Sequence, residues 1–390
     1  MSPAKPKPFQ FHANDRALED LRGRLARTLW PDEVAADAWQ FGPPVSYMKD
    51  FVDYWLNRYN WREQERWINS FPNYITEIRG NQIHFIHQIG KGPNPVPLVM
   101  THGWPGGFFE MLKIIPMLTD PLAHGGRAED AFTVIAPSIP GYGFSSRPEK
   151  RGMNFFAVAD LWAELMEALG YEQFGVQGGD WGSWISASTG LRHPTRVTGI
   201  HLNYLSARIR PAIQESDRPL SPSESKYLAE AAKWADAEAA YFAVQATKPL
   251  TLAYALSDSP VGLAAWHVEK FRSWTHNVGE PDDALTKDEM ITNIMLYWLT
   301  GTTHSAMRFY SEAREQPFHF APEQKVESPT GVVILPAEIP MPPREWVERA
   351  FNVVHWTELP KGGHFAAWEV PDLLAEDIRV FFRPLRRPSR

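Results

Sequence analysis

The chain of 390 residues is long enough for one large domain or two ordinary ones, and its 44% hydrophobic and 22% charged residues are typical of a soluble globular protein. A net charge of −7, with no basic cluster beyond the short tail RPLRRPSR, argues against a nucleic-acid-binding surface. The absence of cysteine excludes disulfides, thiolate nucleophiles and cysteine metal sites.

Residues 1–90 are predicted to form an N-terminal segment that opens with helices. Three leucines at helical spacing follow a predicted cap at Asp15, and SYMKDFVDYWL repeats the pattern, so each helix has an apolar stripe for the core. The first residues lack the apolar region of a signal peptide, and no uncharged apolar run of 18 residues occurs anywhere. We therefore expect a soluble, cytoplasmic protein without a membrane anchor.

Strands and helices then alternate through residues 91–205. Two predicted strands, NYITEIRG and NQIHFIHQIG, already end the N-terminal segment, and PVPLVMTHGW, FTVIAPSIPGYG, FGVQGGDW and VTGIHLNY follow in this range. The helical pattern FAVADLWAELMEALG lies between two of the later strands. Such alternation predicts a parallel sheet whose strands are joined by crossover helices.

Residues 206–325 are predicted to be helical throughout. DSPVGLAAWHVEKFRSW is expected to begin after a cap at Asp258 or Ser259, and TKDEMITNIMLYWL opens with the spacing of a capping box. In residues 326–390 strands return with GVVILPAE and NVVHWTEL, and the helix PDLLAEDIRVFF follows. A helical insertion of this length between two strands of one sheet indicates a lid.

The stretch GVQGGDWGSW places one carboxylate, Asp180, among glycines between a predicted strand and a predicted helix. Strand, tight turn and helix are the context of the nucleophile elbow, whose usual pattern is G-x-S-x-G. Here the pattern is G-x-D-x-G, so aspartate stands where serine is usual. The sequence therefore predicts Asp180 as a nucleophile.

An elbow nucleophile needs a general base, and in such sheets the chain order is nucleophile, acid, histidine. His364 follows the strand NVVHWTEL on a glycine turn, where it would reach the same edge of the sheet. Glu338, just after the strand GVVILP, could orient that imidazole. Glu345 and Glu358 are also available nearby, so the choice of acid stays open at this point.

The turn HGWPGG follows another predicted strand and can supply an oxyanion hole. It can direct the backbone N–H of Trp104 into the site, and the N–H of Trp181, directly after the nucleophile, would be the second donor. The sequence leaves open whether the peptide bond between Trp104 and Pro105 is cis or trans.

A carboxylate nucleophile is suited to displacement at saturated carbon, which fits epoxides and alkyl halides better than esters or peptides. The resulting ester of Asp180 would be hydrolysed by water that His364 deprotonates. An epoxide oxygen needs an acidic O–H donor, whereas a halide needs N–H donors in an apolar pocket. The helical region offers five tyrosines, and their positions alone do not choose among them: Tyr227, Tyr241, Tyr254, Tyr297 and Tyr310.

Several motifs together resemble the microsomal-type epoxide hydrolases, a group that includes the insect juvenile-hormone epoxide hydrolases. The matching segments span nearly the whole chain: LEDLRGRLARTLWPDE, HGWPGG, GGDWGS, QATKPLTLAYALSDSPVGLAAW, RFYSEAR and GGHFAAWEVPDLLAEDIRVFF. The resemblance implies an α/β-hydrolase core with a mostly parallel central sheet, a helical lid, and an N-terminal segment that wraps both.

The resemblance also implies roles for residues of this chain. It places the nucleophile at Asp180, the base at His364 and the charge-relay acid at Glu338, and it selects Tyr241 and Tyr310 as the two lid tyrosines. It implies a small apolar epoxide and water as reactants, with neither a metal nor an organic cofactor. Two departures are the absence of the microsomal anchor and Gly107, where the motif often has serine.

Three alternatives remain at the level of sequence. A haloalkane dehalogenase would use the same nucleophile, with the indole of Trp181 as a halide donor. A non-catalytic α/β-hydrolase module would bind a small hydrophobic ligand, although no triad member is missing. A metal enzyme is disfavoured, because His84 and His87 face opposite sides of a predicted strand. The oligomeric state is open, and a homo-oligomer is compatible with the sequence.

Overall fold

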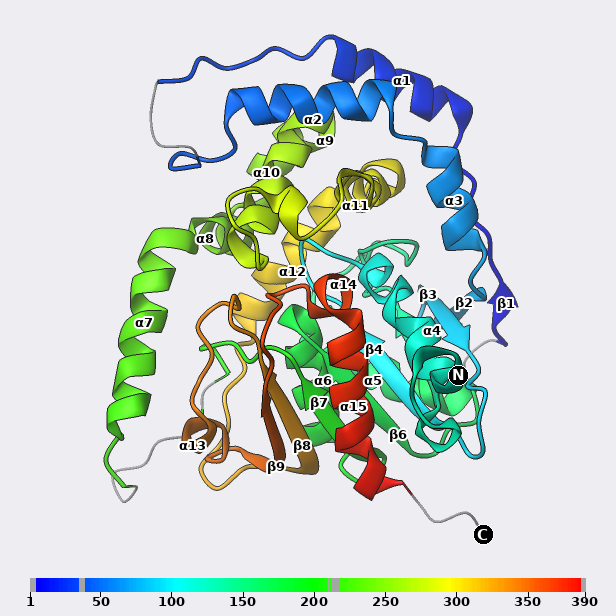
Figure 1. Cartoon of the computed structure of the whole chain (residues 1–390), viewed down its shortest axis with the longest axis vertical. Coiled ribbons are helices and arrows are strands. Elements are labelled where there is room, and N and C mark those ends of the chain that lie inside the picture. Colours follow the sequence, from blue (N-terminus) through cyan, green and yellow to red (C-terminus); the bar gives the residue numbers. More distant parts are fainter. Residues whose placement is uncertain (1–4, 35–38, 210, 212–217, 387–390) are drawn as a thin grey trace.

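One sheet organises the part of the chain that the computed structural model describes, which is residues 5–34, 39–209, 211 and 218–386 (Figure 1). In these ranges the sheet has nine strands in the order β1-β2-β3-β5-β4-β6-β7-β8-β9. The strands are β1 (Lys7–Pro8), β2 (Asn73–Ile78), β3 (Asn81–Gln88), β4 (Val96–Thr101), β5 (Phe132–Pro137), β6 (Phe174–Gly178), β7 (Val197–Leu202), β8 (Val326–Ile334) and β9 (Phe351–Glu358).

Six neighbouring strands, β5, β4, β6, β7, β8 and β9, are parallel. Strands β3, β2 and β1 extend the sheet beyond β5 by antiparallel pairing. The central strands are mainly apolar, and every residue of β5 is buried. Strands of this kind are covered on both faces, as parallel sheets require. The predicted mostly parallel central sheet is confirmed.

Helices cover the sheet and its carboxyl edge. They are α1 (Asp15–Ala26), α2 (Val45–Asn57), α3 (Trp61–Asn69), α4 (Ile114–Thr119), α5 (Phe155–Ala168), α6 (Asp180–Arg192), α7 (Pro222–Glu238), α8 (Ala240–Thr247), α9 (Pro249–Asp258), α10 (Pro260–Trp274), α11 (Lys287–Thr300), α12 (Thr303–Glu315), α13 (Arg344–Val347), α14 (Ala366–Glu369) and α15 (Pro371–Phe382), with short 3-10 turns such as η1 (Phe108–Leu112). α4 packs with α15, and α5 packs with α6.

The helices α7–α12 lie between β7 and β8 in the chain, as the sequence predicts for a helical lid, and α8–α12 lie above the sheet in Figure 1. The N-terminal helices α1 and α2 rest on them from the far side, in contact with α10 and α11. Polar contacts join the two layers: Arg24 pairs with Asp258, and the Tyr54 hydroxyl donates to Asp288 Oδ1 over 3.0 Å. The N-terminal segment therefore holds the helical layer in place.

Helix caps show where the sequence expectations were right and where they were wrong. Ser259 caps α10 by accepting from the N–H of Gly262, and Thr286 forms the predicted capping box with Glu289. The predicted cap at Asp15 is wrong by one residue, because the Asn14 side chain accepts from the N–H of Arg16. Asparagine and aspartate are equally good caps, so the sequence could not decide between neighbours.

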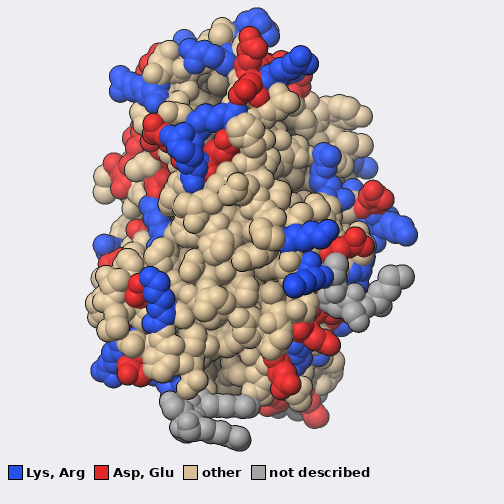
Figure 2. All heavy atoms as spheres, turned by 90° about the vertical axis from the view of Figure 1, so that its right-hand side faces the viewer, with Lys and Arg blue, Asp and Glu red and all other residues tan. Residues whose placement is uncertain are grey.

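On the face that Figure 2 shows, positively and negatively charged side chains are interspersed around the edges, and the band between them has few charged side chains. This distribution agrees with the modest net charge of −7. Within the described ranges, none of the helices combines the length and the apolar character that crossing a membrane would need.

Candidate active site

Asp180 lies at the tip of the turn between β6 and α6, where it is the first residue of the helix. Its φ of +46° is in the left-handed region that residues other than glycine rarely adopt. Such a conformation costs of order 1 kcal/mol or more and persists only where the surrounding structure imposes it. The side chain is 17% exposed, so the carboxylate is reachable from a cavity but is largely shielded from solvent.

Two glycines make this turn sterically possible. A Cβ atom at Gly178 would overlap the backbone of Gly182, and a Cβ atom at Gly182 would overlap the carbonyl oxygen of Thr101. The G-x-D-x-G spacing is therefore explained by the close approach of α6 to β6 and β4. The elbow geometry expected from the sequence is present.

His364 lies between Asp180 and a second carboxylate. Its Nδ1 is 2.6 Å from Glu338 Oε1, and its Nε2 is 3.3 Å from Asp180 Oδ2. The backbone N–H of His364 donates to the carbonyl oxygen of Trp274 over 2.8 Å, which ties the histidine loop to the end of α10. The structure thus brings together three residues that are far apart in the sequence.

The charges of these groups determine the protonation of His364. Burial alone would lower the pKa of this imidazole, but the carboxylates of Glu338 and Asp180 outweigh it and raise the pKa well above its usual value. The raised pKa depends in part on Asp180 being ionised. Any reaction that neutralises Asp180 will therefore lower the pKa of His364.

The structure also distinguishes the three glutamates that the sequence left open. Glu338 is buried beside His364, and its Oε1 also accepts from the N–H of Ile339 over 2.8 Å. Glu345 instead accepts hydrogen bonds from the hydroxyls of Ser221 and Ser223, and Glu358 is exposed at the end of β9. Glu338 is thus the glutamate in contact with the imidazole.

The turn after β4 delivers a backbone donor to Asp180. The N–H of Trp104 donates to Asp180 Oδ1 over 2.9 Å, and the peptide bond between Trp104 and Pro105 is cis. The turn is fixed from both sides: Glu110 Oε1 accepts from the N–H of Gly107 over 2.9 Å, and the Tyr297 hydroxyl donates to the carbonyl oxygen of Gly106 over 2.6 Å. Trp181, the second predicted donor, is in the first turn of α6, where backbone N–H groups lack intrahelical partners.

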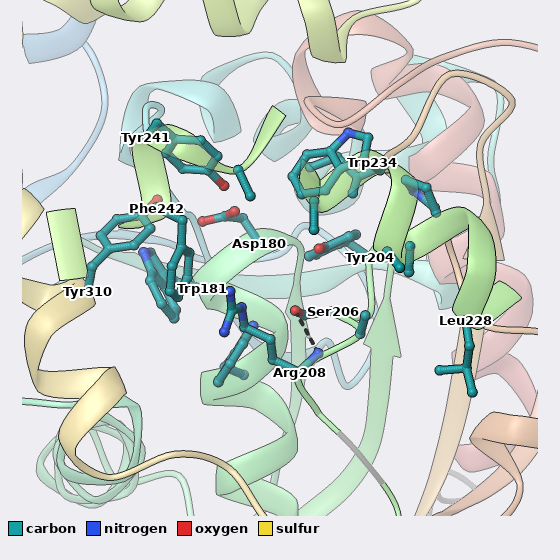
Figure 3. Close-up of a pocket in the computed structure, with 18 residues that line it drawn as sticks. Asp180, Trp181, Tyr204, Ser206, Arg208, Leu228, Trp234, Tyr241, Phe242 and Tyr310 are labelled. Carbon is teal, nitrogen blue, oxygen red and sulfur yellow. Dashed lines mark hydrogen bonds between the residues drawn. The ribbon is translucent and has the colours of Figure 1, made fainter. Parts of the chain in front are cut away.

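A pocket of about 250 Å³ opens beside Asp180 (Figure 3). Its walls are largely aromatic and aliphatic side chains from α6, α7, α8 and α12 and from the loop after β7. Arg208 is a charged exception, and its guanidinium lies 4.1 Å from the ring centre of Phe242. A small apolar molecule that carries a polar atom would fit such a space.

The five lid tyrosines fall in different environments. Tyr241 and Tyr310 line the pocket beside Asp180, and Figure 3 shows both rings on the same side of the carboxylate. Tyr254 is 75% exposed, and Tyr297 is engaged with the turn after β4. Tyr227 packs against Trp346, with ring centroids 6.0 Å apart. The two tyrosines that the resemblance selected are thus the two of this set that lie at the pocket.

Sequence reasoning missed two residues of the site. Tyr204, just after β7, lines the pocket, and its ring centroid is 5.2 Å from that of His364. Glu110 is buried behind the turn that carries Trp104. A signal for Glu110 was present, because glutamate three residues after Gly107 has the spacing of a side chain that closes a turn onto a backbone N–H.

The histidines considered as metal ligands have other partners. His84 Nδ1 is 2.8 Å from the Ser138 hydroxyl, its Nε2 is 2.9 Å from Asn73 Oδ1, and His87 Nε2 is 3.0 Å from the Tyr171 hydroxyl. Burial lowers the pKa of His84 to about 3, so this imidazole is neutral. In the described part of the chain, no group of three or more histidine, aspartate or glutamate side chains could hold a metal ion.

The chain matches two protein families. Residues 6–111 match the family described as epoxide hydrolase N terminus, and residues 96–371 match the alpha/beta hydrolase fold. A relative from Stigmatella aurantiaca that carries the epoxide hydrolase name is 44% identical over 97% of this chain and 85% of its own length. Epoxide hydrolase 1 of Oryctolagus cuniculus is 38% identical over 96% of this chain and 88% of its own length.

Solved structures agree with these matches. The epoxide hydrolase of Aspergillus niger superposes with a TM-score of 0.85 at 29% identity, covering 98% of this chain and 97% of that one. The juvenile hormone epoxide hydrolase of Bombyx mori superposes with a TM-score of 0.85 at 30% identity, covering 98% and 95%. The similarity therefore includes both the sheet and the helices above it.

Proposed function

The chain belongs to the epoxide hydrolases with an alpha/beta hydrolase fold and an epoxide hydrolase N terminus, and from this premise we propose that it converts an apolar epoxide to a vicinal diol through a covalent ester on Asp180. One observation carries the proposal. The carboxylate of Asp180 borders a largely apolar pocket that is lined by the lid tyrosines Tyr241 and Tyr310, and it also faces an imidazole that contacts Glu338.

The first step opens the epoxide ring. Asp180 Oδ2 forms a bond to one epoxide carbon, and the carbon–oxygen bond of the ring breaks. Tyr241 or Tyr310 donates its phenolic proton to the departing oxygen, and the phenolate regains a proton, through solvent, from His364 once the charge of Asp180 is lost. Burial raises the pKa of both phenols well above their usual value, with a contribution from the charge of Asp180, so both carry their protons at neutral pH.

The second step hydrolyses the ester. Water attacks Cγ of Asp180 while His364 Nε2 accepts its proton, and the N–H groups of Trp104 and Trp181 stabilise the oxyanion that forms on Oδ1. The intermediate collapses by breaking the bond between Cγ and the alkyl oxygen, which takes the proton from His364 and leaves as the diol. Asp180 is then a carboxylic acid, and its proton passes to His364, which restores the carboxylate and the protonated imidazole of the free enzyme. Because the ester has no charge, the pKa of His364 is lower in this state than in the free enzyme, and the imidazole can act as a base.

The proposal is tested with the variant His364→Gln. This variant is incubated with a panel of apolar epoxides and haloalkanes and is then digested with a protease. The mass of the peptide that contains Asp180 is measured by mass spectrometry. We expect a peptide heavier by the mass of the whole epoxide, since the ester forms but is not hydrolysed. Under the same conditions His364→Gln combined with Asp180→Asn should gain no mass. Adducts from haloalkanes alone, with halide released, would overturn the assignment to epoxides.

A further inference from the structure

A second, smaller cavity lies beside Asp180, distinct from the substrate pocket. Its volume is about 20 Å³, which is enough for one water molecule because a single buried water needs roughly 10–15 Å³ of such space. Among the described residues, Asp180 is the one that lines both the pocket and this cavity. The same carboxylate therefore borders the space for the epoxide and a separate space for one water.

The cavity wall carries polar atoms that lack partners. Gln177 is buried, and its Nε2 donates to Asn203 Oδ1 over 2.8 Å, but its Oε1 has no partner among the described residues. His364 Nε2, although 3.3 Å from Asp180 Oδ2, makes no hydrogen bond in the described part of the chain. Both residues line the cavity. Since a buried acceptor without a partner is costly, Gln177 Oε1 indicates a water that donates to it. His364 Nε2 can contact the same water, as a donor while the imidazole is protonated and as an acceptor once the imidazole is neutral.

Glu110 lines the same cavity, and one of its two carboxyl oxygens is available to bind a water. Its Oε1 accepts from the N–H of Gly107, and its Oε2 has no hydrogen-bond partner among the described residues. Burial raises the pKa of Glu110 to about 8, with the charge of His364 opposing and that of Asp180 adding to the effect. The carboxyl group is thus mainly protonated at neutral pH and can donate from Oε2.

We propose that this cavity holds the hydrolytic water and that Glu110 orients it by donating a hydrogen bond to the water oxygen. The water then donates to His364 Nε2 and to Gln177 Oε1, accepts from Glu110, and keeps one lone pair for attack. This assignment rests on the proposed ester mechanism. The oxygen attacks Cγ of the Asp180 ester, one hydrogen passes to His364 as a proton, and the other remains on the oxygen that joins Asp180.

The arrangement predicts opposite outcomes for two substitutions of Glu110. Glu110→Gln keeps an acceptor for the N–H of Gly107 and a donor toward the water, whereas Glu110→Met removes both. Misplacement of a reactant can cost about 100-fold in rate, so we expect Glu110→Met to slow ester hydrolysis by about 10- to 100-fold while leaving alkylation within about twofold. Glu110→Gln should retain hydrolysis within about threefold at pH 7.

The pH profile separates this role from simple packing. Ester formation removes the charge of Asp180, which raises the pKa of Glu110, and deprotonation of His364 removes a larger opposing effect, so the pKa of Glu110 should stay raised in the alkyl-enzyme. Wild-type hydrolysis should therefore fall on the alkaline side as Glu110 loses its proton. This fall should be absent in Glu110→Gln, because the amide does not titrate.

The experiment is a single-turnover reaction with styrene oxide, quenched in acid at successive times and followed by the mass of the intact protein. Gain and loss of the adduct give the rates of alkylation and hydrolysis. Glu289→Met is the matched control, since Glu289 also accepts from the backbone N–H three residues earlier but lies outside the cavity wall. If Glu110→Met does not fold, Gln177→Met tests the water site from the other side, with hydrolysis slowed about tenfold.

The results separate the two proposals. Hydrolysis at the wild-type rate in Glu110→Met, or equally slow hydrolysis in Glu110→Gln and Glu110→Met, would overturn the role of Glu110 while leaving the ester mechanism intact. Absence of an adduct in every variant, including His364→Gln, would overturn the ester mechanism and the water site with it.

Discussion

The ring of Tyr241 stacks on the indole of Trp104, with ring centroids 5.3 Å apart and planes inclined by 9°. Trp104 also supplies the N–H that holds Asp180 Oδ1. The proposed proton donor on α8 and the proposed oxyanion donor after β4 are thus parts of one aromatic stack. A substitution that removes only the phenolic oxygen leaves this stack in place.

Tyr241→Phe and Tyr310→Phe should therefore report on proton donation and not on packing. Each single variant should slow alkylation by about 10- to 100-fold, and the double variant by about 100- to 10,000-fold, because a general acid is worth that much. Ester hydrolysis should change far less, and stopped-flow measurement of the two steps separates them. Tyr254→Phe is the control, since that ring is exposed. Equal slowing of both steps would argue for a structural role.

Glu338→Gln should shift the pH dependence of ester hydrolysis. The base is the neutral imidazole, so the rate falls as the pH drops through the pKa of His364. Since the charge of Glu338 raises that pKa, its removal should move the acidic limb to lower pH while the maximum rate falls by about 100-fold. The decay of the isolated alkyl-enzyme at successive pH values measures both effects. An acidic limb that stays in place would mean that Glu338 does not act through its charge.

Gly182→Ala should damage both stability and chemistry. The added Cβ atom would overlap the carbonyl oxygen of Thr101, which is backbone and cannot rotate away. We expect the free energy of unfolding to fall by about 3 kcal/mol or more, measured by urea denaturation, with loss of alkylation. Gly279→Ala is the control and should stay within about 0.5 kcal/mol of wild type, because its Cβ atom would meet no atom within 4 Å.

Asp377→Asn tests a buried charge away from the pocket. Asp377 contacts His201 and His355, each over 2.8 Å. Burial alone would raise the pKa of Asp377, but these hydrogen bonds outweigh it and lower the pKa well below its usual value. The substitution should lower the free energy of unfolding by about 2 kcal/mol near pH 7.

The pH dependence of this loss follows from the direction of the shift. A carboxyl group whose pKa is depressed by folding contributes its full stabilisation above its unfolded pKa of about 3.9, and loses it progressively as the pH falls below that value. The difference between wild type and Asp377→Asn should therefore be largest at neutral pH and shrink below about pH 4. Urea denaturation at several pH values measures it, and a constant difference would contradict the assignment.

Local patterns and motifs were enough to predict the sheet, the helical insertion and the elbow. β5 is a mainly apolar run, and the elbow is a short motif whose glycines are required by close backbone contacts within the turn and with β4. Because these features are local, the fold class could be predicted, and the structure confirms it. The catalytic roles of Asp180 and His364 remain predictions that the geometry supports.

The sequence could not show which side chains from distant segments point toward one another in the folded protein. The position of Glu338 after a strand made it the proposed acid, but the residues alone left Glu345 and Glu358 open, and the choice of Glu338 came from the resemblance. In the structure, the packing of the loop after β8 against the histidine loop places Glu338 beside the imidazole. The tyrosines of the helical region were likewise separated by tertiary contacts. The spacing of Glu110 from Gly107 indicated a turn contact, but the position of Glu110 at the cavity depends on tertiary packing and could not be predicted from that spacing.

The contact of α1 and α2 with the helices above the pocket has a consequence for recombination between relatives. A chimera in which only the segment from α7 to α12 comes from a relative would replace one partner in each of three contacts, Arg24 with Asp258, Tyr54 with Asp288 and Tyr59 with Thr292. Substrate preference encoded in those helices is therefore best transferred together with the first 69 residues. In this protein the two segments should be inherited, or engineered, as one piece.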